Sequence, residues 1–308
     1  MRFLGISLLS FACLGLGSPS AFSQTPTTFR EARKNHKTNL FYAPESPPSS
    51  TFDLVHYASP LGPMSAYVTP DPSDGKKHPA IIWLVGGLSN SIGANLWEDG
   101  EPSNDQTASA YRKAGVIMMF PSLRGGNDNP GHREVCFGEV DDVIAAAESL
   151  SKLPYVDPER IYLGGHSTGG TLALLVAGST DRFRAIISFG PVHTVAGYGQ
   201  EVLPFDATDT QELVVRAPIA CLSEIQSPTV VLEGTENGNI ESLELMRKAC
   251  QNPQVKFHSI PSATHFNILA PFNDLFARKI LKDTDPTPEL QLTEKEILDT
   301  VKLLSPEK

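Results

Sequence analysis

The chain has 308 residues, of which 40% are hydrophobic and 19% charged, and its formal net charge at pH 7 is -10. This length is enough to bury one large core, as expected of a single α/β domain. The acidic balance argues against a nucleic-acid partner, because phosphate binding requires a basic footprint.

Residues 1–23 have the features of a signal peptide. Arg2 supplies a short positive region, and the apolar stretch 3–16 is too short to cross a bilayer comfortably. A small-x-small sequence, Ala-Phe-Ser, precedes Gln24. We therefore expect an exported protein, periplasmic or secreted, that begins at Gln24 and has no stable membrane insertion. Lipidation of Cys13 is the alternative, but the residue three positions before it fits a lipobox poorly.

The N-terminal part of the remaining chain is polar before it becomes strand-like. Residues 24–50 are rich in Pro, Ser and Thr, which indicates a loosely ordered lead-in. Residues 52–70 contain two alternating stretches around a Pro-Leu-Gly-Pro sequence, a pattern that predicts a β-hairpin. A charged, turn-rich linker follows at 71–78.

From residue 80 onward, predicted strands and helices alternate. Short apolar runs predict buried strands at 80–85, 116–120, 161–163, 185–189, 229–233 and 255–260. Helices are expected at 105–114, 140–150, 168–177, 240–249 and 272–281. This alternation predicts an α/β fold with a mainly parallel, twisted sheet and helices on both faces. Residues 191–227 lack clear periodicity and form a candidate lid insertion above the strand ends.

The end of the chain carries a helix-start signal. Thr293 and Glu296 have the spacing of a capping box before an apolar pair, which predicts a last surface helix. We assign residues 285–308 to a C-terminal helical extension.

Three cysteines remain after removal of the signal peptide: Cys136, Cys221 and Cys250. An oxidising compartment permits one disulfide. Cys221 and Cys250 flank the predicted strand 229–233 and are the pair that would meet, whereas three buried free thiols are the alternative.

The strongest chemical signal is the Gly-His-Ser-Thr-Gly sequence at residues 165–169. A predicted strand leads into it and a predicted helix follows, which is the arrangement of a nucleophile elbow. Small neighbours let the strand and helix pass closely, and the helix N-terminus favours developing negative charge. The sequence therefore predicts Ser167 as a nucleophile. A glycine-rich turn without chemistry is the alternative.

His265 is the predicted general base. It follows the last predicted strand and precedes a helix. In a serine hydrolase, such a histidine removes the serine proton and later returns it to the leaving group. His166, inside the elbow, is expected to pack or to orient its neighbours.

A glycine pair directly after the strand 80–85 is the predicted oxyanion loop. Acyl transfer develops a negative oxygen that backbone N–H groups stabilise. We expect the hole to combine the N–H of Thr168, the residue after the nucleophile, with the N–H of Gly87 or Leu88. An ordinary glycine turn is the alternative.

The motifs together resemble the prolyl-oligopeptidase and dienelactone-hydrolase branch of the α/β-hydrolases. The matching pieces lie within 65–282 and read HPAIIWLVGG, PSLRGGNDNPG, GEVDDVIAAAESL, YVDPERIYLGGHSTGG and SATHFNIL. The resemblance implies an α/β-hydrolase catalytic domain at 51–284 that cleaves a peptide, ester or related acyl bond through an acyl-enzyme. It places the nucleophile on Ser167, the base on His265 and the oxyanion loop on the glycine pair.

The sequence departs from this family pattern at the oxyanion loop and upstream of the catalytic domain. Val85 stands where the family often has histidine before the two glycines. The segment upstream of the predicted hydrolase domain is too short for a propeller, so we do not expect a size filter on oligopeptides.

The acid of the triad is displaced as well. The family places an aspartate three residues after the glycine that ends the penultimate strand, but this position holds Asn237. Asparagine would orient the histidine without supplying charge. We favour Glu236, whose longer side chain would reach the same place, ahead of Glu233 at the strand end. Glu241 and Asp206 are weaker candidates.

These features predict a serine hydrolase, either a peptidase or a carboxylesterase, acting on a peptide or small-molecule substrate. A non-catalytic binding protein that kept the fold after losing the acid is the alternative. A lipase is disfavoured because the candidate lid is polar.

No nucleotide, flavin or metal-ligand pattern is present in the sequence, so we expect no cofactor and no metal. Arg124 and Asp128 either hold their loop or touch substrate. The oligomeric state is not predicted.

Overall fold

The computed structural model describes residues 42–288 and 290–306. The predicted signal peptide, Cys13 and most of the lead-in therefore lie outside the described residues. Among the residues described, no helix is both long enough and apolar enough to cross a membrane.

The core is an eight-stranded sheet. Its strands are β1 (Asp53–Ser59), β2 (Gly62–Val68), β3 (His78–Leu84), β4 (Ile117–Pro121), β5 (Val156–His166), β6 (Ile186–Phe189), β7 (Thr229–Glu236) and β8 (Val255–Thr264). They lie in the order β1-β2-β4-β3-β5-β6-β7-β8. β1 and β2 form the predicted hairpin and join β4 in antiparallel pairing, whereas all other pairs are parallel. The predicted mainly parallel sheet is confirmed.

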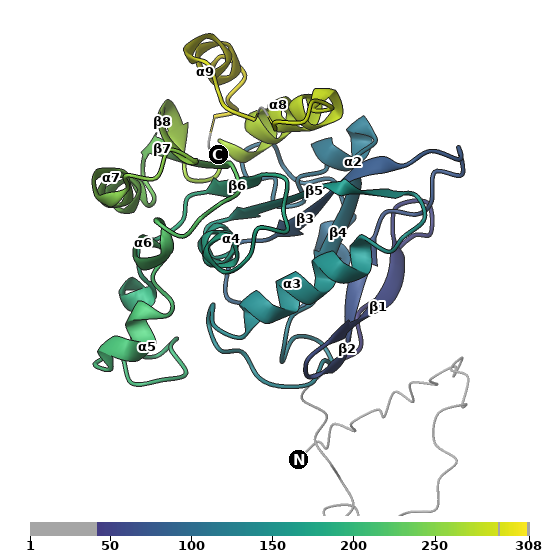
Figure 1. Cartoon of the computed structure of the whole chain (residues 1–308), viewed down its shortest axis with the longest axis horizontal. Coiled ribbons are helices and arrows are strands. Elements are labelled where there is room, and N and C mark those ends of the chain that lie inside the picture. Colours follow the sequence, from purple (N-terminus) through teal and green to yellow (C-terminus); the bar gives the residue numbers. More distant parts are fainter. Residues whose placement is uncertain (1–41, 289, 307–308) are drawn as a thin grey trace, which may run out of the picture. The chain divides into compact units, whose positions relative to one another are not determined.

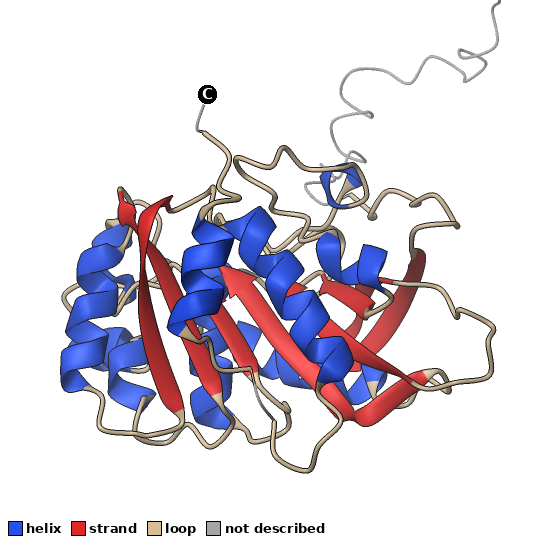
Figure 2. Cartoon of the chain, turned by 90° about the horizontal axis from the view of Figure 1, so that it is seen from above, coloured by secondary structure: helices blue, strands red, loops and turns tan. Residues whose placement is uncertain are grey.

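Helices cover both faces of this sheet (Figure 1 and Figure 2). The described helices are η1 (Ala94–Leu96), α2 (Ala110–Ala114), α3 (Glu139–Leu150), α4 (Thr168–Ser179), η2 (Val195–Tyr198), α5 (Thr210–Val214), α6 (Pro218–Cys221), α7 (Ile240–Ala249), α8 (Leu269–Lys282) and α9 (Glu294–Val301). One buried cluster joins the sheet to α3, α4 and α7, and a second joins the other face to α2 and α8. Burial on both faces explains why the parallel strands are apolar runs in the sequence.

One predicted helix is shorter than expected. Residues 105–109 precede α2 as turns, because Asp105 accepts hydrogen bonds from the backbone N–H and the hydroxyl of Thr107. Such an Asx turn competes with helical hydrogen bonding. Ala108 also has a left-handed backbone, with φ of 45°. This irregular segment brings polar side chains to the edge of the site described below.

The candidate lid contains η2, α5 and α6. α6 packs against α4 and α7, so it lies beside the sheet. Buried Arg216 is held between two aromatic rings, with its guanidinium carbon 4.8 Å from the Phe137 centroid and 4.3 Å from the Phe205 centroid. Such stacking ties the insertion to the loop before α3.

The cysteines and the start of the last helix bear on two further expectations. Cys136, Cys221 and Cys250 are free cysteines, so the proposed Cys221–Cys250 pairing is not formed. The capping box at Thr293 and Glu296 begins α9 as expected, with both reciprocal bonds present.

Candidate active site

Ser167 lies in the turn between β5 and α4, with φ of 55° and ψ of −115°. A side-chain-bearing residue rarely adopts this conformation, and such strain is typical of functional positions. The turn is held in place because the Ser167 N–H donates to the Phe189 carbonyl at 2.8 Å. The Ser167 carbonyl in turn accepts from the Thr171 N–H at 2.9 Å.

Two glycines permit the close approach of strand and helix in this turn. A Cβ added to Gly165 would lie 2.6 Å from the carbonyl carbon of Gly169. A Cβ added to Gly169 would lie 2.7 Å from the carbonyl oxygen of Val85. Any larger residue at either position would push the helix off the sheet, which explains the Gly-x-Ser-x-Gly spacing in physical terms.

His265 directly follows β8 and contacts a buried carboxylate. Its Nδ1 lies 2.8 Å from Oε2 of Glu233, which is fully buried at the end of the apolar part of β7. Glu233 also accepts hydrogen bonds from the N–H of Gly234 at 2.7 Å and the N–H of Asn239 at 2.9 Å. These bonds fix the position of the carboxylate that faces the imidazole.

Our leading expectation for the acid, Glu236, requires correction. Glu236 is exposed, and its side chain is near the hydroxyl of Thr235 rather than His265. The pairing of β7 with β8 shifts register between Gly234 and Glu236, and the residues of β7 beyond Gly234 are exposed. The geometry favours the alternative candidate, Glu233.

The other candidates for the acid lie elsewhere. Asn237 is exposed, has φ of 63° and lines the pocket that also contains Ser167 and His265. The hydrogen bond to Nδ1 of His265 comes from Glu233 instead. Glu241 is an exposed residue in the first turn of α7. Asp206 is exposed and accepts hydrogen bonds from Thr208 within its own turn. Thr208 holds the pKa of the Asp206 carboxyl below its usual value.

The position of Glu233 requires a glycine opposite it. A Cβ added to Gly190, at the end of β6, would lie 2.6 Å from Nδ1 of His265 and 2.8 Å from Oε2 of Glu233. Gly190 also has φ of 57°, which side chains rarely adopt. The imidazole–carboxylate contact therefore fills the space that this glycine leaves.

The predicted oxyanion loop lies beside Ser167. A Cβ on Gly86 would be 3.3 Å from the Cβ of Ser167, which places the loop against the nucleophile. The hydroxyl of Thr168 donates to the carbonyl of Gly87, and Arg133 donates to the carbonyl of Leu88 at 2.6 Å. These two bonds hold the loop next to the nucleophile, where its backbone N–H groups would contribute to the predicted oxyanion hole.

Ser167 and His265 line a common pocket of about 640 Å³. Its other lining residues are neutral: Ser103, Asn104, Tyr198, Asn237, Gly238, Asn239 and Phe266. Of the candidate lid, Tyr198 at the end of η2 reaches this pocket. The pocket is large enough for a peptide or small-molecule group.

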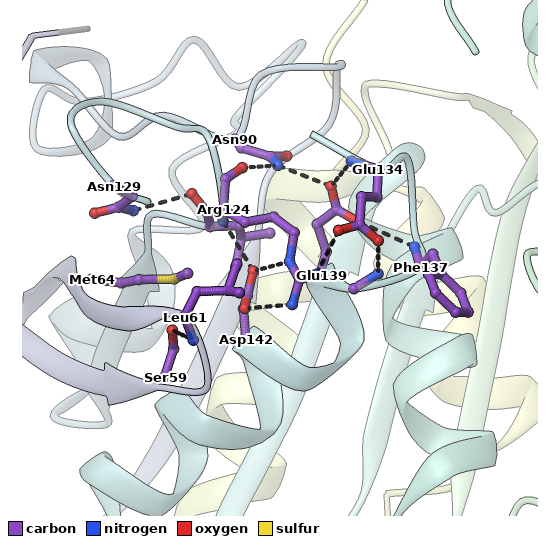
Figure 3. A network of polar contacts seen from close by, with 12 residues as sticks. Ser59, Leu61, Met64, Asn90, Arg124, Asn129, Glu134, Phe137, Glu139 and Asp142 are labelled. Carbon is purple, nitrogen blue, oxygen red and sulfur yellow. Dashed lines mark hydrogen bonds and ion pairs between the residues drawn. The ribbon is translucent and has the colours of Figure 1, made fainter. Parts of the chain in front are cut away.

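Behind the oxyanion loop lies a buried ionic network (Figure 3). Arg124, 6% exposed, pairs with both oxygens of fully buried Asp142 and with Glu134 at 2.7 Å. Asn90, just after the oxyanion loop, donates to the Arg124 carbonyl at 2.8 Å and to Glu139 at 3.0 Å. Arg124 therefore holds its loop, and it is not among the residues that line the pocket of Ser167 and His265.

His166 and Gln106 form a second polar cluster next to the nucleophile. His166 is 1% exposed, and its ring centroid lies 4.5 Å from that of His265. Burial, together with the nearby His265 ring, lowers the pKa of His166 to about 3. Gln106 belongs to no recognisable motif and lies in a segment that we expected to be helical. The sequence alone therefore does not identify it as a residue of the site.

Comparison with curated proteins identifies partial relatives. The chain is 28% identical over 173 residues to the α/β hydrolase domain-containing protein WAV2 of Arabidopsis thaliana, covering 50% of this chain and 55% of that protein. It is 25% identical over 159 residues to the prolyl endopeptidase of Elizabethkingia miricola, covering 48% of this chain and 21% of the enzyme. The matched segments span about half or less of these relatives.

Solved structures share the fold. The acylaminoacyl peptidase of Pyrococcus horikoshii matches 80% of this chain and 44% of its own, with a TM-score of 0.61 and 15% identity. A 2,6-dihydroxy-pseudo-oxynicotine hydrolase matches 79% of this chain and 72% of its own, with a TM-score of 0.60 and 18% identity. The family model described as "Prolyl oligopeptidase family" matches residues 102–269, more than half of the chain. The chain therefore belongs to the prolyl oligopeptidase family and has the α/β-hydrolase fold.

Proposed function

We propose that the protein is a serine hydrolase that cleaves a peptide, ester or amide bond through an acyl-enzyme. The observation that carries this proposal is the contact between His265 and the buried carboxylate of Glu233, beside a serine in a strained elbow. Membership of the prolyl oligopeptidase family favours a peptidase over a carboxylesterase.

The first step of the proposed reaction is acylation. The Nδ1–H of His265 donates to Glu233, which leaves the Nε2 lone pair free to accept the proton of Ser167. The Ser167 oxygen attacks the substrate carbonyl carbon, and the carbonyl electron pair moves onto oxygen. The N–H of Thr168 and the N–H of Gly87 or Leu88 stabilise this oxyanion.

The second step releases both products. His265 returns the proton to the leaving group as the tetrahedral intermediate collapses to an acyl-serine. A water molecule then attacks the acyl carbon while His265 takes its proton, and collapse regenerates the Ser167 hydroxyl. Throughout, the negative Glu233 stabilises the imidazolium that forms.

The contact with Glu233 also bears on the binding-protein alternative. That hypothesis depends on loss of the acid, because Asn237 stands where the family has aspartate. A charged carboxylate hydrogen-bonded to His265 supplies the same orientation and charge from a neighbouring position. The enzyme hypothesis is therefore the better supported of the two.

Turnover measurements test the proposal. The wild type, Ser167→Ala and His265→Ala would be assayed with p-nitrophenyl esters and peptide p-nitroanilides. We expect turnover by the wild type that is lost in both variants, and anilide cleavage would distinguish a peptidase from an esterase. A folded wild type without turnover of either class contradicts the proposal.

We also propose that the protein is exported and begins at Gln24. The charged, apolar and small-x-small segments of residues 1–23 support this proposal. N-terminal sequencing of protein recovered outside the cytoplasm tests it. Protein that retains Met1 inside the cell would contradict it.

A further inference from the structure

A chain of hydrogen bonds connects the oxyanion loop to the backbone carbonyl of the catalytic histidine. It involves no side chain of the triad. The N–H of Gly86 donates to Oε1 of Gln106 at 3.1 Å. Nε2 of Gln106 lies 2.9 Å from Nδ1 of His166, and Nε2 of His166 lies 2.9 Å from the carbonyl oxygen of His265. We call Gln106 and His166 the bridging pair.

Two backbone groups, the N–H of Gly86 and the carbonyl of His265, set the directions of the bonds in this chain. Nε2 of Gln106 also donates to Oδ1 of Asn104 at 2.7 Å, while its Oε1 accepts from Gly86. If the Gln106 amide were flipped, its N–H groups would face the N–H of Gly86, donor against donor. Nδ1 of His166 therefore accepts from Gln106, and Nε2–H of His166 donates to the His265 carbonyl.

This arrangement uses the neutral form of His166. A charged imidazolium would carry a proton on Nδ1 and face the amide hydrogens of Gln106. Burial and the nearby His265 ring hold the pKa of His166 at about 3, so the neutral form prevails at physiological pH. The bridging pair thus keeps one hydrogen-bonding pattern across the working pH range.

The bridging pair is also packed tightly against the reacting centre. A Cβ on Gly86 would lie 2.9 Å from Nδ1 of His166 and 3.3 Å from the Cβ of Ser167. The oxyanion loop, the nucleophile and the bridging pair are therefore in mutual contact. Gln106 is hydrogen-bonded directly to the loop at Gly86 and reaches His265 through His166. A displacement of Gln106 would therefore move the loop relative to His265.

We propose that Gln106 and His166 are positioning residues that hold the oxyanion loop and His265 in a fixed relation around Ser167. The inference rests on the proposed function and deepens it, since neither residue belongs to the triad or the oxyanion hole. Hydrogen bonds to the transition state depend steeply on placement, and neither Gln106 nor His166 lines the pocket of Ser167 and His265. Loss of the bridging pair therefore lowers kcat with little change in KM.

The first experiment compares two matched glutamine substitutions. Gln106→Met keeps the length of the side chain but removes its hydrogen bonds. Gln200→Met is the control, because the exposed Gln200 bonds only backbone groups, at Phe205 and Ala207. We expect Gln106→Met to lower kcat on a p-nitrophenyl ester by about 10- to 100-fold, and Gln200→Met to leave it unchanged.

A second pair of variants tests rescue and guards against misfolding of Gln106→Met. His166→Phe keeps the ring and removes both hydrogen bonds. His166→Gln restores an amide N–H toward the His265 carbonyl and an oxygen that accepts from Gln106. We expect His166→Gln to recover most of the kcat that His166→Phe loses.

Two results would overturn the inference while leaving the proposed function intact. One is a folded Gln106→Met with wild-type kcat, and the other is a rise in KM at constant kcat. If the wild type has no turnover, the proposed function fails, and ¹⁵N imidazole spectra of histidine-labelled protein decide this inference. Displaced His265 ring signals in folded Gln106→Met support it, and unchanged signals contradict it.

Discussion

At the scale of single residues, the carboxylate proposed to orient His265 comes from a strand. Glu233 belongs to β7, where it pairs with Ser259 of β8, and its carboxylate is fully buried. A strand holds a side chain more precisely than a loop does. The charge on Glu233 is thus placed by the sheet itself, with the N–H groups of Gly234 and Asn239 fixing its oxygens.

Glu233 and Glu236 provide a matched pair for testing this assignment. Glu233→Gln keeps the shape but removes the negative charge that stabilises the imidazolium, so we expect kcat to fall by about 10³- to 10⁴-fold. Glu236→Gln alters an exposed carboxylate and should leave kcat near the wild-type value. Ester turnover measured at one pH compares them, and the reverse ranking would restore Glu236 as the acid.

Gly190 is the second residue whose role follows from the position of Glu233. Gly190→Ala places a methyl group against the imidazole and carboxylate, so we expect kcat/KM to fall by about 10²-fold or more. Gly197→Ala is the control, because an added Cβ there meets nothing within 4 Å. Equal activity of the two variants would show that the His265–Glu233 contact is unnecessary.

The sequence identifies Ser167 and His265 as candidates because each has a local signature at a strand end. It does not decide the acid, since three glutamates and Asn237 lie within residues 233–241, and the choice depends on which side chain the fold buries against His265. Gln106 has no local signature at all. Its contacts reach residues 20 and 60 positions away, so only the fold brings them together.

At the scale of elements, the loop after β4 acts as a rigid support for the oxyanion loop. Asn90 connects the two through hydrogen bonds to the Arg124 carbonyl and to Glu139. The Arg124 guanidinium lies over Gly138 at the start of α3, where any side chain would collide with it. The network therefore joins β3, β4 and α3 behind the site.

This network predicts a large effect on stability. Arg124→Met leaves Asp142 as a buried, unpaired charge, so we expect the free energy of unfolding to fall by about 3–5 kcal/mol. Arg278→Met removes an exposed ion pair with Asp274 and should change it by less than about 1 kcal/mol. Urea unfolding measures both, and a small effect of Arg124→Met would show that the network contributes little.

Most elements follow from hydrophobic patterning, because strands buried on both faces require continuous apolar runs. Helix 240–249 is found with its predicted bounds, and the other strands and helices differ mainly at their ends. The expected helix at 105–114 begins late, because Asp105 and Thr107 form a side-chain turn that apolar periodicity does not report. The structure of residues 191–227 depends on tertiary contacts such as those of Arg216, which the sequence pattern does not show.

At the scale of the whole molecule, buried His166 links stability to pH. Its pKa is about 3 in the folded protein, against about 6.5 for an unperturbed histidine. Between pH 3 and pH 6.5, the unfolded state therefore binds up to one more proton at this histidine than the folded state does. The contribution of neutral, buried His166 to the free energy of unfolding is complete above pH 6.5, and it declines as the pH falls toward 3.

A substitution at His166 isolates this contribution. Below pH 6.5, we expect the unfolding free energy of the wild type to fall more steeply with decreasing pH than that of His166→Phe, by up to about 1.4 kcal/mol per pH unit. Urea titrations at several pH values between 4 and 8 measure both slopes. Parallel curves would show that His166 is not held neutral by the fold.

Covalent labelling would show whether Ser167 is an activated nucleophile. The native protein would be treated with a fluorophosphonate, digested, and mapped by mass spectrometry. We expect one adduct on Ser167, absent from Ser167→Ala and formed more slowly in Glu233→Gln. A folded protein that forms no adduct would show that Ser167 is not activated, and equal rates in the wild type and Glu233→Gln would show that Glu233 does not act through His265.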